Sequence, residues 1–134
     1  MGRTYLFECP RCEYRVAVAG GTERGLLCQI QTFRCKDCRA LLDVTTRVRV
    51  ESREVPPRQD LGRSDAWQDQ LRRRFSNWHL QLPMGVAARD RWVTLKPRCP
   101  VSPIHRVEPW THPGKCPRCE VHLERTVMPY RIWE

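Results

Sequence analysis

The sequence predicts a small, β-rich α+β fold: two modules of short antiparallel strands, joined by a linker and one amphipathic helix. Three observations support this prediction. Cysteines come in Cys-x-x-Cys pairs near both ends of the chain, apolar residues alternate along residues 1–50, and a helical stripe lies at about 65–79. We therefore expect modules at 1–50 and 91–134, with the linker and the helix at 51–90.

The N-terminal module is predicted from alternating, β-branched segments around its cysteines. These segments are TYLFE, YRVAVAGG, GLLCQIQTF and LLDVTTRVRV, and the second ends in a Gly-Gly turn. In the last segment Val44, Val48 and Val50 fall on one face of a strand, because strand side chains repeat with a period of two. Cys28 lies among apolar residues of the third segment, where we expect it to be a buried small hydrophobe.

The middle of the chain combines a linker with a helical pattern. Residues 51–63 are polar and contain two consecutive prolines, which is typical of a linker. Apolar residues then recur at i, i+4, i+8 and i+11, namely at Trp67, Leu71, Phe75 and Trp78. That spacing predicts one amphipathic helix at about 65–79. Residues 91–134 return to short strands separated by proline-rich turns.

The composition limits the classes of protein to consider. The 134-residue chain carries a formal charge of +9, and cysteine thiolates that hold two zinc ions lower this to about +6. It starts without a secretory signal, and no apolar run is long enough to span a membrane, so we expect a cytoplasmic protein. Paired cysteines in that compartment are metal ligands more often than disulfides. A basic chain also suits nucleic acid or a larger acidic protein as partner.

Cys9, Cys12, Cys35 and Cys38 form the first expected metal site. Their two Cys-x-x-Cys pairs are separated by 22 residues, enough for two strands and a turn. Each pair can occupy two corners of a tetrahedron, so that two pairs complete a four-cysteine site. A redox dithiol is the alternative, but it usually comes as a single pair beside a βαβ unit.

The residues Cys9-Pro10-Arg11-Cys12-Glu13-Tyr14 and Cys35-Lys36-Asp37-Cys38 resemble the metal loops of zinc-ribbon and rubredoxin-like proteins. The resemblance covers about the first 45 residues and implies zinc, with iron as the alternative at this four-cysteine site. These families usually place glycine after the second cysteine, where a positive φ is favourable. Here that position holds Glu13, Arg39 and, in the later pair, Glu120. We expect either a charged contact surface or tolerated left-handed residues.

A second site is expected from Cys99, Cys116 and Cys119, with one ligand missing. The stretch resembles a small heavy-metal-binding module with the pattern Cys-Pro-x-His-Pro, followed by Pro-Gly-Lys-Cys-Pro-x-Cys. The matching residues are Cys99, Pro100, Pro103, Pro113, Gly114, Lys115, Cys116, Pro117 and Cys119. Ser102 occupies the histidine position, and a neutral hydroxyl is a poor zinc ligand.

Three histidines compete to be the fourth ligand of this second site. We favour His105, because it follows Cys99 by six residues in a loop that can return to the metal. His112 lies in a Thr-His-Pro-Gly turn before Cys116, and His122 would have to fold back over its own cysteine pair. If none of them binds, the site has three cysteines and an open position, which is a feature of catalytic zinc.

The sequence matches no catalytic signature, so we expect a protein that is not an enzyme and that binds two zinc ions. Net positive charge, interspersed tryptophans and the run Arg72-Arg73-Arg74 favour a nucleic-acid-binding module. Charged tips of the cysteine loops and the C-terminal segment VMPYRIWE favour a protein adaptor instead. A rubredoxin-like electron carrier is less favoured, because such carriers are usually acidic and this chain is basic.

Overall fold

The computed structural model describes residues 1–51 and 90–134, and this part of the chain consists of β-strands, turns and loops. Its strands are β1 (Gly2–Glu8), β2 (Arg15–Val18), β3 (Thr22–Arg24), β4 (Cys28–Cys35), β5 (Ala40–Glu51), β6 (Asp90–Thr94), β7 (Val107–Pro109), β8 (Glu124–Arg125) and β9 (Arg131–Trp133). The expected helix at 65–79, nearly all of the expected linker, and Arg72, Arg73 and Arg74 lie outside the described residues. No helix in the described ranges is long and apolar enough to cross a membrane.

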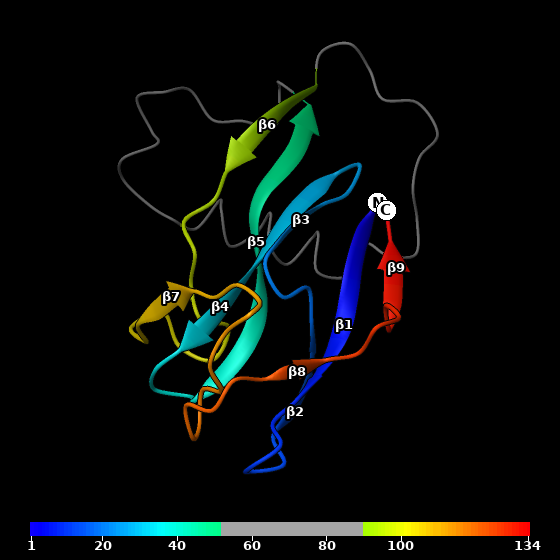
Figure 1. Cartoon of the computed structure of the whole chain (residues 1–134). Coiled ribbons are helices and arrows are strands. Elements are labelled where there is room, and N and C mark those ends of the chain that lie inside the picture. Colours follow the sequence, from blue (N-terminus) through cyan, green and yellow to red (C-terminus); the bar gives the residue numbers. More distant parts are fainter. Residues whose placement is uncertain (52–89) are drawn as a thin grey trace.

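The strands form two antiparallel sheets (Figure 1). In the first sheet, β1 pairs with β2, β8 and β9. In the second, the strand order is β3-β4-β5-β6, and β7 pairs with the end of β4. The predicted β-rich architecture of short antiparallel strands is therefore confirmed for the described part of the chain.

Both sheets combine strands from the two ends of the sequence. Phe7 of β1 faces Arg125 of β8, and Gly2 faces Trp133 of β9. In the second sheet, β6 pairs with β5 and β7 with β4. Residues 1–50 and 91–134, which we expected to form separate modules, thus share both sheets. Strands of two or three residues have too few backbone partners of their own, and longer N-terminal strands supply them.

Two apolar clusters stabilise these sheets. The larger one surrounds Phe7, whose ring meets that of Trp110 edge-on with 5.4 Å between the ring centroids. This cluster includes Cys9 and Cys116, so the core extends into the cysteine loops. Buried members of the smaller cluster are Val48, Val50, Val93 and Leu95. The three valines that alternation placed on one face of β5 are all buried, and Cys28 packs, half-buried, against the smaller cluster.

A buried polar network fixes the turn after β2. The fully buried Thr32 hydroxyl accepts a hydrogen bond from the Gly20 N–H at 2.9 Å and donates one to the Asp43 carboxylate at 2.6 Å. Burial raises the pKa of Asp43, whereas the hydrogen bond from Thr32 opposes that rise. Gly20 has a φ of 78°, and a Cβ atom there would lie 2.5 Å from the Phe7 ring. This turn therefore requires glycine.

Candidate metal centres

The eight residues expected to bind metal converge into two groups of four. The first group consists of Cys9, Cys12, Cys116 and Cys119, and the second consists of Cys35, Cys38, Cys99 and His105. This finding corrects the expected grouping, which combined the two N-terminal cysteine pairs in one site and the four C-terminal ligands in the other. Each group instead takes two ligands from each end of the chain.

Strand pairing explains why the ligands cross over. β8 pairs with the end of β1, with Glu124 opposite Glu8, and this brings the loop 116–119 beside the loop 9–12. β7 pairs with the end of β4, with Val107 opposite Cys35, and this brings the loop 99–105 beside the loop 35–38. Proximity in the sequence suggests that ligands close in the chain bind the same ion. Strand pairing between distant segments overrides that proximity.

The first group has the dimensions of a tetrahedral metal site. The Sγ atoms of Cys9 and Cys119 lie 3.3 Å apart, and those of Cys12 and Cys116 lie 3.6 Å apart. Metal–sulfur bonds of about 2.3 Å in a tetrahedron separate two sulfurs by about 3.8 Å. All four residues are free cysteines, and their sulfurs lie within 4.8 Å of one another. This group can therefore hold one metal ion with little movement.

The second group combines three thiols with one imidazole. The Cys38 sulfur lies 3.7 Å from that of Cys99 and 3.3 Å from Nδ1 of His105. The same nitrogen lies 3.8 Å from the Cys35 sulfur. In a tetrahedral zinc site a sulfur and a nitrogen ligand lie about 3.6 Å apart. Three thiols and one imidazole with these separations can also hold a metal ion.

His105 is the histidine that the structure places in a cysteine group, among the residues described. Its N–H donates to the Ser102 carbonyl at 3.2 Å, and this hydrogen bond closes the turn that returns the chain to Cys99. His112 instead packs near the Phe7 ring, where burial lowers its pKa, and His122 is exposed. The loop after Cys99 thus brings His105 back beside Cys99, as expected, but both join Cys35 and Cys38 rather than Cys116 and Cys119.

Backbone N–H groups direct hydrogen bonds at the cysteine sulfurs and favour thiolates. The Cys12 N–H donates to the Cys9 sulfur at 3.5 Å, and this bond is the main reason why the pKa of Cys9 falls to about 6. Burial opposes ionisation of Cys99, but hydrogen bonds from the backbone of Ser102 and its neighbour and from the side chains of His105 and Cys35 together lower the pKa to about 7. One thiol in each group is therefore ready to ionise near neutral pH, as metal binding requires.

The residue after each Cys-x-x-Cys pair adopts a left-handed backbone. The φ angles are 59° at Glu13, 52° at Arg39 and 63° at Glu120, at the positions where glycine is usual in similar loops. Two of these side chains also connect the loops of different groups. Glu120 pairs with Arg34 at 3.3 Å, and Arg39 donates to the Arg118 carbonyl at 2.9 Å. A left-handed backbone costs a residue with a Cβ roughly 1–2 kcal/mol, and such exposed contacts recover at most part of that cost.

No protein-family model, curated protein or solved structure matches this sequence. The two ligand groups are compatible with modules of the zinc-ribbon type. The likeness to such modules therefore rests on the residues themselves: the paired cysteines, the four-ligand groups and the left-handed residue after each pair.

Proposed function

We propose that the chain is a non-catalytic protein that holds two zinc ions and binds single-stranded nucleic acid. Zinc suits both donor sets, because it prefers four sulfur or nitrogen ligands in a tetrahedral arrangement. Each group offers four such ligands, so a bound zinc would keep no open position for a substrate. Zinc with four protein ligands stabilises a fold and does not activate water.

The nucleic-acid proposal is supported by the outer face of the second sheet. Trp92 lies on β6, and the Arg24 guanidinium from β3 lies 4.7 Å from the centre of its ring. The Arg47 guanidinium from β5 lies 5.9 Å from the same ring. The neighbours Val48 and Val93 belong to the smaller core. Strand alternation therefore directs the tryptophan and both arginines to the opposite, outer face.

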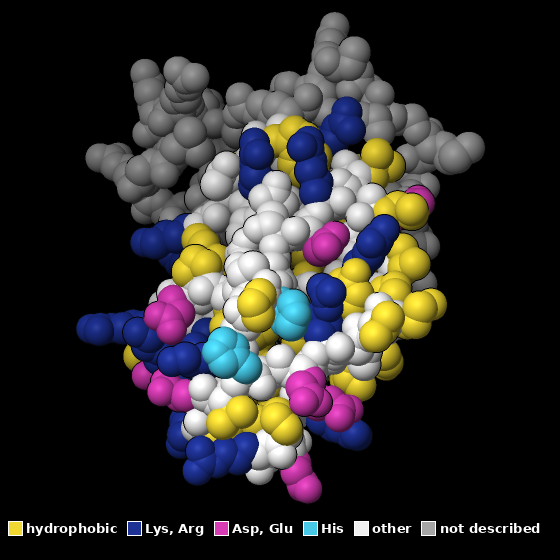
Figure 2. Space-filling model, in the orientation of Figure 1, with side chains coloured by type: hydrophobic (Ala, Val, Ile, Leu, Met, Phe, Trp, Pro, Cys, Tyr) yellow, Lys and Arg dark blue, Asp and Glu magenta, His cyan; other side chains and the backbone are white. Residues whose placement is uncertain are grey.

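Among the residues that the structure describes, both arginines lie near the ring of Trp92 and have no acidic partner. Within the described residues, neither Arg24 nor Arg47 forms a salt bridge, and Nε of Arg47 is buried without a hydrogen-bond partner. Figure 2 shows basic side chains flanking an apolar group where Figure 1 places β3, β5 and β6. Guanidinium groups held in this way can bind phosphates while bases stack on neighbouring aromatic surface.

Fluorescence anisotropy with a short single strand, repeated across a range of salt concentrations, tests this interface. Trp92→Ala should weaken binding by about 1–3 kcal/mol, the usual contribution of one stacked base. Arg24→Gln should lower the slope of log affinity against log salt by about 0.7, the value for one phosphate contact of a single strand.

Two control variants remove similar side chains from other surfaces. Tyr130 is an aromatic residue that is 68% exposed near β9, and Arg15 is an exposed arginine paired with Glu8. Tyr130→Ala and Arg15→Gln should bind like the unaltered protein. Equal losses in control and test variants would overturn the proposed interface.

A protein adaptor is the second candidate, because the segment before β9 exposes neighbouring apolar side chains. Val127 is 93% exposed, Met128 is 75% exposed, and Tyr130, two residues further along the chain, is 68% exposed. Exposed apolar groups that lie together are typical of interaction surfaces. Capture from a lysate with and without nuclease separates the two candidates. Nuclease-resistant capture of one protein, abolished in Met128→Ser, would favour the adaptor.

Elemental analysis tests the metal itself. We expect two zinc ions per chain, one in each group of four ligands. A red protein with iron bound by the group around Cys9 would instead support the electron carrier.

A further inference from the structure

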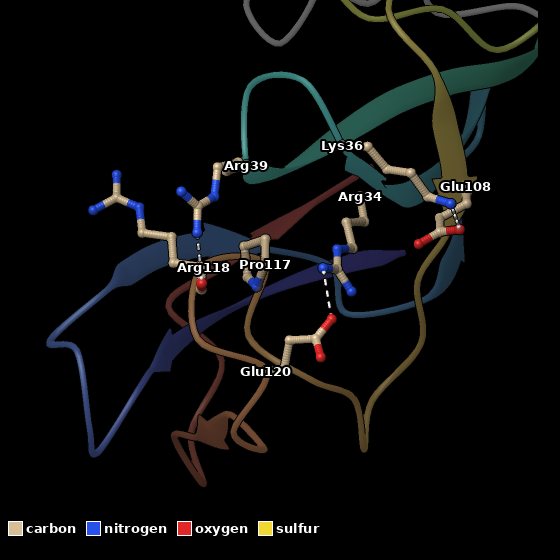
Figure 3. Close-up of a pocket in the computed structure, with 7 residues that line it drawn as sticks. All are labelled: Arg34, Lys36, Arg39, Glu108, Pro117, Arg118 and Glu120. Carbon is tan, nitrogen blue, oxygen red and sulfur yellow. Dashed lines mark hydrogen bonds and ion pairs between the residues drawn. The ribbon is translucent and has the colours of Figure 1, made fainter.

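A cleft of about 510 Å³ lies between the loops of the two metal groups (Figure 3). Its lining side chains are Arg34, Lys36, Arg39, Glu108, Pro117, Arg118 and Glu120. Three of them come from the end of β4 and the loop that follows, one comes from β7, and three come from the loop 116–119 and its next residue. The cleft therefore exists because the crossed grouping places these two loops side by side.

Four basic side chains and two carboxylates line this cleft, so its own side chains carry two more positive than negative charges, not counting the thiolates of the neighbouring metal groups. Both carboxylates are already paired: Glu120 lies 3.3 Å from Arg34, and Glu108 lies 3.1 Å from Lys36. Arg39 and Arg118 form no salt bridge within the part of the chain that the structure describes. Nε of Arg34 is in addition buried without an acceptor.

The simpler explanation is that this network only ties the two loops together. Arg39 does so through the Arg118 carbonyl at 2.9 Å, and the Arg118 guanidinium lies 4.7 Å from the centre of the Tyr14 ring. A structural link does not require four basic side chains, however, and like charges at close range repel one another. An anion bound among the four basic side chains lowers that repulsion.

We propose that this cleft binds a phosphate monoester dianion, and that its source is the terminal phosphate of a nucleic-acid strand. The source rests on the proposed function, whereas the phosphate chemistry rests on the cleft alone. A phosphate monoester carries close to two negative charges at neutral pH, whereas each internal linkage of a strand carries one. The lining cations therefore attract a terminal phosphate more strongly than an internal linkage. Arginine suits this ligand, because its planar fork donates two hydrogen bonds to phosphate oxygens.

Three versions of one single strand test the proposal: one with a 5′-phosphate, one with a 3′-phosphate and one with neither. Anisotropy should show one phosphorylated end binding roughly threefold to tenfold more tightly than the unphosphorylated strand, the effect expected of partly exposed charge contacts. Lys36→Gln should reduce this preference. Arg131→Gln, which removes an exposed arginine on β9 outside the cleft lining, should leave it unchanged.

Glu120→Gln separates phosphate binding from a structural role. Loss of this carboxylate releases Arg34 and increases the positive surplus, so the preference for a phosphorylated end should increase. A network that only ties the loops together predicts no increase. A preference that is unchanged or smaller in Glu120→Gln would therefore overturn the proposal.

The outcomes for the strand and for the cleft are distinguishable. If strands bind without any preference for a phosphorylated end, the cleft proposal fails and the proposed function stands. If no strand binds, inorganic phosphate is added at constant ionic strength. A higher melting temperature in the unaltered protein but not in Lys36→Gln would then support the cleft and refute the proposed function. No change in either protein would refute both.

Discussion

Paired ligand substitutions test the crossed arrangement of the metal groups most directly. Cys9 and Cys116 belong to one group, and Cys35 belongs to the other. Structural zinc binding is worth about 10–16 kcal/mol. Loss of one ligand in four should therefore remove roughly 3–4 kcal/mol, or about 100-fold to 1,000-fold in affinity. Cys9→Ser should release one of two zinc ions to a chelator of intermediate strength, and so should Cys116→Ser.

Double variants distinguish the crossed grouping from one based on proximity in the chain. Cys9→Ser combined with Cys116→Ser damages a single group, so one zinc should remain. Cys9→Ser combined with Cys35→Ser damages both groups, so neither zinc should remain. Proximity predicts the reverse for each pair. Competition against a graded series of chelators, followed by elemental analysis, gives the zinc content. One zinc retained by the Cys9 and Cys35 double variant would refute the crossed arrangement.

Three further predictions concern the turn, the buried network and the spare cysteine. Gly20→Ala should lower the free energy of unfolding, measured by urea denaturation, by about 2–4 kcal/mol, because the new Cβ would clash with the Phe7 ring and the backbone there has a φ of 78°. Gly21→Ala is the control and should cost less, because the atom nearest to its Cβ would lie 3.6 Å away. The raised pKa of Asp43 means that its stabilising contribution falls as pH rises through that pKa. Thr32→Val removes a bond that favours the ionised carboxylate, so its cost should be greater at neutral than at mildly acidic pH, and equal costs would contradict this. Cys28→Val should keep both zinc ions and change stability by less than about 1 kcal/mol, as calorimetry and elemental analysis can show.

Features that depend on neighbouring residues could be predicted from the sequence, but the grouping of the ligands could not. Alternation identified the buried valines of β5, and the cysteine loops identified the left-handed positions. Chain proximity is weaker evidence, because loop-closure entropy changes slowly with length. Closing the 103 residues between Cys12 and Cys116, rather than the 22 between Cys12 and Cys35, costs only about 1.4 kcal/mol more. That difference is small compared with the free energy of binding a structural zinc ion, about 10–16 kcal/mol. The pairing of β8 with β1 and of β7 with β4 therefore decides which ligands share a group.

The crossed arrangement also connects metal content to the two proposed surfaces. The cleft walls come from loops of different ligand groups, one through Cys35 and the other through Cys116, so we expect both sites to need an ion for the cleft to form. By linkage, a phosphate that binds only the complete cleft should in turn increase the retention of both metals. The face around Trp92 differs, because β3, β4, β5 and β6 carry no ligand of the first group. Selective loss of the ion bound by the first group should therefore abolish the preference for a phosphorylated end, whereas strand binding through Trp92 should persist. Simultaneous loss of both activities would show that the two surfaces depend on one folding unit.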